Sequence, residues 1–298
     1  MRAAAGLLTQ ALELGLVGAT DVLDDEVRLV PVPRSNLLHR LDVGGRPIAF
    51  VKQQGQAGAT DGTATVAQET QALRLLGGGP VPDLLHADDG CVWTAALGGI
   101  PLYAALPTAP EPVAAALGSA LATLHGTAVD PWPEPPRATL PWPVTDATPA
   151  SIDRVPADSA AAALLAQVRD GADARRLAGA GRRWRTGHWV HGDLSGANAL
   201  VDRVGGRARV SFLDLEDAGV GDPSWDVVSA LRCLDDALVP GAAEAAREAF
   251  WGAYRDGGGS GEEDPALRLA HDAMADVRAA LTELSAAGAG ATAGAVGR

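Results

Sequence analysis

The chain has 298 residues, of which 47% are hydrophobic, and a formal net charge of −13. This length suits one two-lobed unit or two small domains, and the apolar content is enough for a sizeable core. The acidic balance disfavours nucleic acid and anionic membranes as general partners. The sequence contains no run of about 18 apolar residues, the length that would predict a membrane helix.

The N-terminal third is predicted to form strands and two helices. Two glycines, Gly44-Gly45, separate strand-like runs and indicate a hairpin. The second helix is stopped by Gly77-Gly-Gly79. The predicted elements are a helix over 3–17, strands over 27–32, 37–43 and 46–52, a helix over 65–76 and a strand over 91–97.

The rest of the chain is predicted to be mainly helical, with short strands in its middle. A proline-rich loop is expected over 130–149, and residues 287–298, which are mostly Ala, Gly and Thr, are expected to be a disordered tail. Helices are predicted over 113–126, 160–178, 223–238, 242–255 and 265–286, and strands within 187–201 and over 208–213.

One constellation carries most of the chemical information. Asp193 is followed five residues later by Asn198, and Asp214 comes at the end of an alternating apolar run. A phosphoryl-transfer site needs such a set, since one carboxylate orients the attacking hydroxyl while an amide oxygen and a second carboxylate hold Mg²⁺. The interpretation is that Asp193 is the catalytic base and that Asn198 and Asp214 are metal ligands.

Scarce residue types give an independent indication. Lys52 is the sole lysine, and Asn36 and Asn198 are the sole asparagines. This composition suggests a coding bias that replaces lysine and asparagine wherever another residue serves. Lysine resists replacement by arginine where a compact point charge is needed. Chance is the alternative, but three survivors at positions typical of kinases make it unattractive.

Lys52 has a predicted partner on the helix over 65–76. Glu69 lies on the same helical face as Val66, Leu73 and Leu76, and a carboxylate on an inward face is costly unless a cation meets it. A Lys52–Glu69 pair is the arrangement that positions lysine on nucleotide phosphates. The alternative is a glutamate at a partly exposed edge of that face.

Other residues are expected to support the site. His191 is predicted to brace the loop by hydrogen bonds, Asp222 to start a helix before Pro223, and Asp226 to hold the loop amides. Ser35 and Asn36 could cover a phosphate, although this pair is also ordinary turn chemistry. Glu216 and Asp217 could also reach a metal, but they are interpreted as solvated or structural neighbours. The other histidines are expected to serve packing or the surface, and the two distant cysteines, Cys91 and Cys233, predict reduced thiols in a cytoplasmic protein.

The segments His191-Gly-Asp-Leu-Ser-Gly-Ala-Asn198 and Leu213-Asp-Leu-Glu-Asp-Ala-Gly-Val-Gly-Asp-Pro-Ser-Trp-Asp226 resemble the aminoglycoside phosphotransferase and choline kinase family. The resemblance implies an α+β, bilobal, protein-kinase-like fold. A small N-lobe with an antiparallel sheet would cover 1–97, and a larger, mainly helical C-lobe would cover 98–286. One departure is Ser195-Gly-Ala before Asn198, where many members have His-Pro-Gly.

The resemblance also implies roles for individual residues. Asp193 matches the catalytic aspartate, and Asn198 and Asp214 match the Mg²⁺ ligands. Lys52 matches the phosphate-binding lysine and Glu69 its partner. The hinge that contacts the nucleotide base matches Leu97, Gly98 and the two residues after them.

The activity implied is transfer of the γ-phosphoryl group of ATP or GTP to a hydroxyl of a small molecule, such as an aminoglycoside or another amino alcohol. The negative net charge leans toward a cationic acceptor. A kinase for Ser or Thr of a peptide natural product is a close alternative. A catalytically silent binding module is a third, but it has no reason to keep Lys52, Glu69, Asp193, Asn198 and Asp214 together. The sequence does not choose among acceptors.

Overall fold

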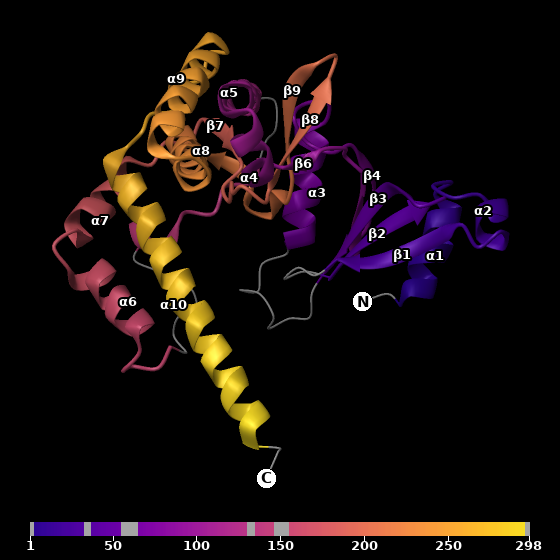
Figure 1. Cartoon of the computed structure of the whole chain (residues 1–298), viewed down its shortest axis with the longest axis horizontal. Helices are drawn as coiled ribbons and strands as arrows, with labels where there is room; N and C mark the ends of the chain where they lie inside the picture. Colours follow the sequence, from indigo (N-terminus) through magenta and orange to yellow (C-terminus); the bar gives the residue numbers. More distant parts are fainter. Residues whose placement is uncertain (1–2, 33–36, 55–64, 130–134, 146–154, 296–298) are drawn as a thin grey trace.

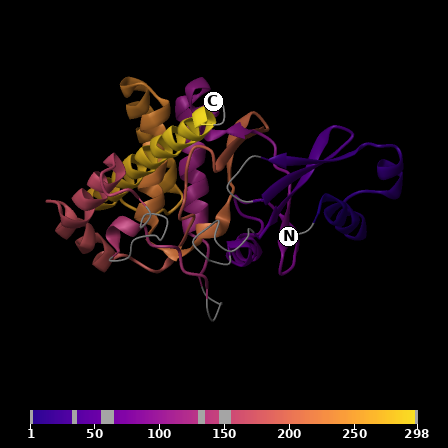
Figure 2. The same ribbon diagram turned by 90° about the horizontal axis from the view of Figure 1, so that it is seen from below.

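A computed structural model describes residues 3–32, 37–54, 65–129, 135–145 and 155–295, with the backbone alone for Thr65 and 284–295. The chain forms a bilobal α+β fold (Figure 1). An antiparallel sheet lies at one end of the molecule and helices lie at the other, and the view turned by 90° shows the same separation (Figure 2).

The N-terminal sheet has five strands in the order β1-β2-β3-β5-β4, and all neighbours are antiparallel. The predicted hairpin is present: β2 and β3 are joined by Gly44 and Gly45, both with positive φ, as a two-residue hairpin turn requires. Sequence analysis overlooked one short strand, β4. The strands are β1 (Val27–Val32), β2 (Leu37–Val43), β3 (Arg46–Gln53), β4 (Leu84–Ala87) and β5 (Cys91–Ala95).

One face of this sheet is covered by α1 (Ala4–Glu13), whose Leu7 and Ala11 are fully buried against Leu41, Val51 and Trp93. The prediction of one helix over 3–17 is wrong at its C-terminal end. Gly15 adopts φ +68° and ends the helix, and the short α2 (Ala19–Leu23) follows. The helix α3 (Thr65–Leu76) has the predicted bounds.

The central strands connect the sheet to the helical region. β6 (Ile100–Pro101) follows β5 after four residues and pairs with β8 (Ala199–Val204), which forms a hairpin with β9 (Arg207–Phe212). β7 (His188–Val190) pairs with β10 (Gly219–Gly221). The loops after β7 and β9 therefore lie close together, and they carry the predicted catalytic motif.

The large core lies where helices pack on these strands. Leu117 and Leu121 of α5 (Pro110–His125) are fully buried in one cluster with Trp189 of β7, Phe212 of β9 and Phe250 of α9 (Pro240–Asp256). The other elements of this half are α4 (Leu102–Ala105), α6 (Ala160–Asp170), α7 (Ala174–Arg183), α8 (Pro223–Ala237), α10 (Pro265–Ala295), and the 3₁₀ turns η1 (Leu106–Thr108), η2 (Trp142–Val144) and η3 (Leu215–Asp217).

Two predictions for this half need correction. The single helix over 160–178 is two helices, because the chain leaves helical geometry at Gly171, where ψ is −178°. The tail over 287–298 is not disordered throughout, since α10 continues to Ala295 (yellow in Figure 1). Alanine has the highest helix propensity, so an alanine-rich extension propagates an existing helix at little entropic cost. Residues 296–298 lie outside the described residues.

None of the helices described here combines the length and the apolar character needed to cross a lipid bilayer.

Candidate active site

The predicted ion pair between Lys52 and Glu69 is present. Lys52 lies near the end of β3 and Glu69 on the inward face of α3, and Lys52 Nζ is 2.9 Å from Glu69 Oε2. Both side chains are buried, with 8% and 9% of their surfaces exposed. Burial raises the pKa of Glu69, and the charge of Lys52 opposes that rise.

Lys52 also meets two carboxylates from the other half of the chain. Its Nζ lies 2.5 Å from Asp214 Oδ1 and 2.7 Å from Glu216 Oε2. Burial alone would lower the pKa of Lys52, but attraction to Glu69, and then to Asp214 and Glu216, raises it above the ordinary value. One cation thus faces three carboxylates. Glu216, interpreted from the sequence as a solvated or structural neighbour that could reach a metal, contacts the predicted phosphate-binding lysine directly.

Asp214 has an unusual backbone. It adopts φ 62° and ψ 64°, the left-handed region that few residues other than glycine enter, directly before η3. This conformation turns the chain after β9, so that Asp214 and Glu216 both reach Lys52. Strained backbone of this kind is concentrated at functional sites.

His191 joins the two loops that carry the motif. Its Nε2 donates a hydrogen bond to the carbonyl oxygen of Leu213 at 2.8 Å, and its Nδ1 accepts one from the amide of Asp193 at 3.3 Å. The two partners assign the proton to Nε2. The predicted bracing role of His191 therefore has a geometric basis, and the ring sets the position of Asp193 relative to Asp214.

Asn198 lies beside Asp193. Its Nδ2 donates hydrogen bonds to the backbone carbonyl of Asp193 at 3.0 Å and to Asp193 Oδ2 at 3.3 Å. Both bonds use the amide nitrogen, so Oδ1 remains as a neutral oxygen donor. Burial raises the pKa of Asp193, while His191 and Arg278 act in the opposite direction.

The oxygen atoms of Asn198, Asp214 and Glu216 suit a hard cation, and the excess of carboxylates over Lys52 supplies a negative field. In the described part of the chain, no cluster of three or more His, Cys, Asp or Glu side chains could hold a metal by itself. Mg²⁺ commonly takes one or two protein ligands and completes its octahedron with phosphates and water. These residues therefore fit a Mg²⁺ ion that arrives with a triphosphate.

Asp226 is fully buried under the loop that carries Asp193. Its carboxylate accepts hydrogen bonds from the amides of His191 at 2.6 Å and Gly192 at 3.1 Å, as predicted. Its third partner, His125 Nε2 at 3.1 Å, was overlooked. Burial alone would raise the pKa of Asp226, but the bond from His125 and the remaining partners lower it.

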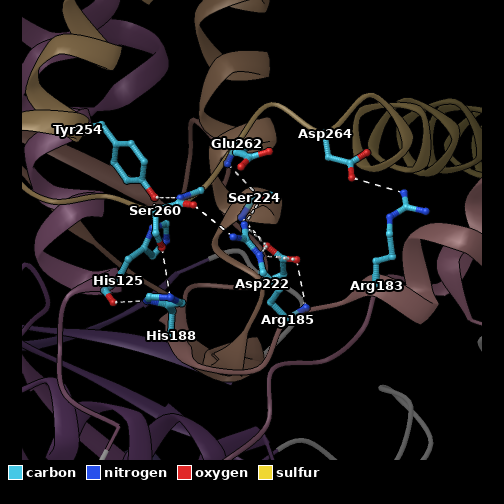
Figure 3. A network of polar contacts seen from close by, with 11 residues as sticks. His125, Arg183, Arg185, His188, Asp222, Ser224, Tyr254, Ser260, Glu262 and Asp264 are labelled. Atoms are coloured by element: carbon cyan, nitrogen blue, oxygen red, sulfur yellow. Dashed lines mark hydrogen bonds and ion pairs between the residues drawn. The ribbon is translucent and has the colours of Figure 1, made fainter.

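The network continues from His125 toward the loop before α10 (Figure 3). His125 Nδ1 lies 2.7 Å from the hydroxyl of Tyr254, which accepts a hydrogen bond from the amide of Gly261 at 2.9 Å. His188 contacts both the carbonyl of His125 and Ser260 Oγ. From the sequence, these histidines were expected to serve packing or the surface. The only sequence signal for a special role of His125 was its position at the end of α5.

Asp222 starts α8, as predicted. Its Oδ1 accepts a hydrogen bond from the amide of Ser224 at 3.0 Å, and its carboxylate pairs with Arg185, whose Nη2 is 3.0 Å from Oδ1 (Figure 3). Burial alone would raise the pKa of Asp222, and the bonds from Arg185 and Ser224 lower it. Asp222 is a structural residue of the helix start and does not face Lys52.

Two cavities flank the motif. The first, about 240 Å³, is lined by Lys52, Glu69, Asn198 and Asp214, together with apolar residues of the sheet and Leu97. Gly98, predicted with Leu97 to contact a nucleotide base, is not among its lining residues. The second cavity, about 160 Å³, lies on the side of Asp193, Ser195 and Gly196 and is closed by α8 and α10. Ser35 and Asn36 lie outside the described residues.

Several solved structures of other proteins have a similar fold. The Plasmodium vivax ethanolamine kinase has a TM-score of 0.57 and 13% identity, covering 92% of this chain and 78% of its own. The macrolide 2'-phosphotransferase from Brachybacterium faecium has a TM-score of 0.55 and 19% identity, covering 95% and 93%. An aminoglycoside phosphotransferase from Streptomyces rimosus, solved with ADP and streptomycin, has a TM-score of 0.52 and 18% identity, covering 90% and 98%.

At these identities the structural matches establish the protein-kinase-like fold alone. A search of curated protein sequences gave no significant match. The decisive finding is that the sequence model of the phosphotransferase enzyme family matches residues 26–268, which includes both motif segments. Because that match extends over most of the 298 residues, the chain belongs to the phosphotransferase enzyme family.

Proposed function

We propose that this protein transfers the γ-phosphoryl group of ATP or GTP to a hydroxyl of a small molecule. The observation that carries the proposal is the convergence of Lys52, Asp214 and Asn198 on one cavity, with Asp193 beside Asn198. Such transfer depends on positioning and on neutralising phosphate charge, and this arrangement supplies a cation, oxygen ligands and a carboxylate near one another.

The donor nucleotide would occupy the 240 Å³ cavity. Its apolar walls suit a purine ring, and Lys52, held by Glu69, would contact the phosphates. We place the hinge at Leu97 and Gly98, and with it the division between an N-lobe over 1–97 and a C-lobe over 98–286. A phosphate-covering role for Ser35 and Asn36 remains part of the proposal.

Asn198 Oδ1 and Asp214 would hold Mg²⁺, which neutralises the phosphate oxygens when bound. Lys52 contacts Asp214, so a triphosphate would compete with that contact for the ammonium group. Asp214 would then be free to face the metal. Glu216 shares the same ammonium group and would stay close to the metal as a source of negative charge.

Asp193 would accept a hydrogen bond from the acceptor hydroxyl and direct its oxygen toward the γ-phosphorus. Burial raises the pKa of this carboxylate, which makes it a better proton acceptor once the oxygen–phosphorus bond forms. His191 and Asp226 act through the loop: they hold its backbone and do not touch the substrate. A cytoplasmic location is also proposed, in keeping with two cysteines that are not joined by a disulfide.

The test begins with thermal unfolding in the presence of Mg²⁺ and ATP or GTP. A nucleotide that binds only the folded state raises Tm by mass action, and the better donor gives the larger rise at equal concentration. Transfer of radiolabelled phosphate is then screened on aminoglycosides, amino alcohols, hydroxy acids and basic peptides. Transfer to peptides alone would favour the peptide-kinase alternative. Absence of both a Tm shift and transfer would favour a silent binding module.

A further inference from the structure

The charged side chains that line the cavity on the acceptor side of Asp193 are balanced, unlike those of the whole chain. Although the net charge is −13, the charged side chains lining this cavity are Asp193, Asp236, Arg232 and Arg278. His271 also lines it, and burial lowers the pKa of that ring, which favours the neutral form. Two aspartates are therefore matched by two arginines, and the described wall is not acidic.

The two arginines differ in their partners. Arg232 is engaged: its Nε lies 3.1 Å from Asp236 Oδ1 and its Nη1 lies 3.2 Å from Asp272 Oδ1. Asp236 is thus already neutralised and offers little to a cationic ligand. No described carboxylate forms an ion pair with Arg278, although Arg278 is close enough to lower the pKa of Asp193 electrostatically.

The position of Arg278 on α10 directs it to the cavity. His271, Met274, Ala275 and Arg278 recur at the spacing of one helical face, and all four line the cavity. Trp225 and Met274 add an apolar wall, and Nδ1 of His271, whose ring lies 5.6 Å from that of Trp225, is buried without a hydrogen-bond partner. The cavity therefore offers a free guanidinium and an unused imidazole nitrogen next to the carboxylate that would receive the hydroxyl.

We infer that the acceptor is a small hydroxy acid, whose carboxylate binds Arg278 while its hydroxyl faces Asp193. A guanidinium recognises a carboxylate through two parallel hydrogen bonds, and this geometry fixes the orientation of the ligand as well as adding affinity. The inference rests on the proposed phosphotransfer at Asp193. It replaces the cationic acceptor suggested by the net charge, because the charged side chains lining this cavity are balanced and Asp236 is already paired.

The test uses acceptors that differ only in charge. One set is glycerate, glycerol and 3-amino-1,2-propanediol; a second, with an aromatic body for the Trp225 wall, is 4-(hydroxymethyl)benzoate, 4-(hydroxymethyl)benzamide and 4-(aminomethyl)benzyl alcohol. Phosphate transfer from saturating Mg²⁺–ATP or Mg²⁺–GTP gives kcat/KM for each. We expect the carboxylate to have the highest value in at least one set. Arg278→Gln should lower that value about 10- to 100-fold, the worth of a charge-assisted hydrogen bond, and change the neutral member by less than about threefold.

Two further variants make the result specific. Arg278→Lys should recover part of the lost kcat/KM, since it restores the charge without the fork. Arg207→Gln removes an exposed arginine from β9, outside the cavity, and should keep the preference for the carboxylate. A preference for the neutral or cationic member, an equal loss for all three members in Arg278→Gln, or a raised KM for nucleotide alone would each overturn the inference.

Failure of the inference can be told apart from failure of the proposed function. Transfer to aminoglycosides or amino alcohols, with none to any carboxylate, would overturn the hydroxy acid and leave phosphotransfer standing. Absence of nucleotide binding together with absence of transfer to every acceptor would overturn both.

Discussion

Lys52 Nζ lies 2.5 Å from Asp214 Oδ1, although the two residues are 162 positions apart in the chain. The contact joins the end of β3 to the loop after β9, and it shares its ammonium group with Glu69 and Glu216. The residues proposed for phosphate and metal binding are thus held together by their own charges.

The Lys52–Glu69 pair predicts strong coupling between the two residues. Lys52→Met should lower the free energy of unfolding by about 3 kcal/mol, since it leaves Glu69 buried without a cation. Glu69→Gln in the Lys52→Met background should recover part of that loss, because the uncompensated charge is gone. Urea unfolding of both single variants and the double variant measures the coupling. Strictly additive losses would contradict a direct interaction.

The backbone of Asp214 predicts a difference between two substitutions that both remove its carboxylate. Asparagine tolerates the left-handed conformation at φ 62°, whereas alanine is strained there by about 1 kcal/mol. Asp214→Asn should therefore be more stable than Asp214→Ala by about that amount, while both lose at least about 100-fold in transfer because the anionic Mg²⁺ ligand is missing. Thermal unfolding together with the Mg²⁺ dependence of transfer checks this. A more stable alanine variant would argue against the strained turn.

Gly192 lies in the loop between His191 and Asp193, and its conformation excludes a side chain. Its φ is +85°, and a Cβ atom there would lie 2.4 Å from the carbonyl oxygen of Asp217. Gly192→Ala should cost about 2 kcal/mol or more and displace Asp193, so that transfer falls with it. Gly187→Ala is the matched control, since a Cβ atom at that position meets nothing within 4 Å. Equal effects of the two substitutions would refute the steric explanation.

Asp226 predicts a loss of stability in acid. Its pKa in the folded protein is lowered: burial alone would raise it, but the bonds and charges of His125 and His191 together outweigh burial. Its contribution to the free energy of unfolding is therefore complete above the unfolded pKa of about 4 and disappears as the pH falls through the lower folded pKa. Asp226→Asn should cost about 3 kcal/mol at pH 7, and the gap to the wild type should shrink below pH 4.

Urea unfolding from pH 7 to pH 3 measures that gap. Glu13→Gln, at an exposed position of α1, is the control and should stay within about 0.5 kcal/mol of the wild type. A gap at Asp226 that widens in acid would contradict the assigned sign.

The fold was largely predictable because local patterns of apolar and polar residues in the sequence indicate its strands and helices. Alternation and the Gly44-Gly45 pair gave the bounds of β1 to β3 within one residue, and the apolar stripe gave α3 and the inward position of Glu69. Errors occurred where the pattern was too short or too uniform: the four-residue β4, the break at Gly171 and the alanine-rich end of α10.

Contacts across the chain were harder to predict. The approach of Glu216 to Lys52 depends on the left-handed turn at Asp214, which no local sequence signal specifies. His125 contacts Asp226, which is 101 residues away in the chain, and the spacing of neither residue in the sequence predicts this contact. Arg232 pairs with Asp272, whereas Arg278 has no ion-pair partner among the described carboxylates. Both outcomes follow from the packing of α8 against α10. For that reason net charge was a poor guide to the acceptor cavity.

The most direct test of the account is phosphate transfer by Asp193→Asn, which keeps the shape of the side chain and removes its charge. The variant should bind Mg²⁺–ATP or Mg²⁺–GTP with a Tm shift close to that of the wild type, while kcat falls by about 100-fold or more, the contribution expected of a positioned base. Transfer by Asp193→Asn at the wild-type rate, with nucleotide binding intact, would contradict the assignment of the reaction to this site.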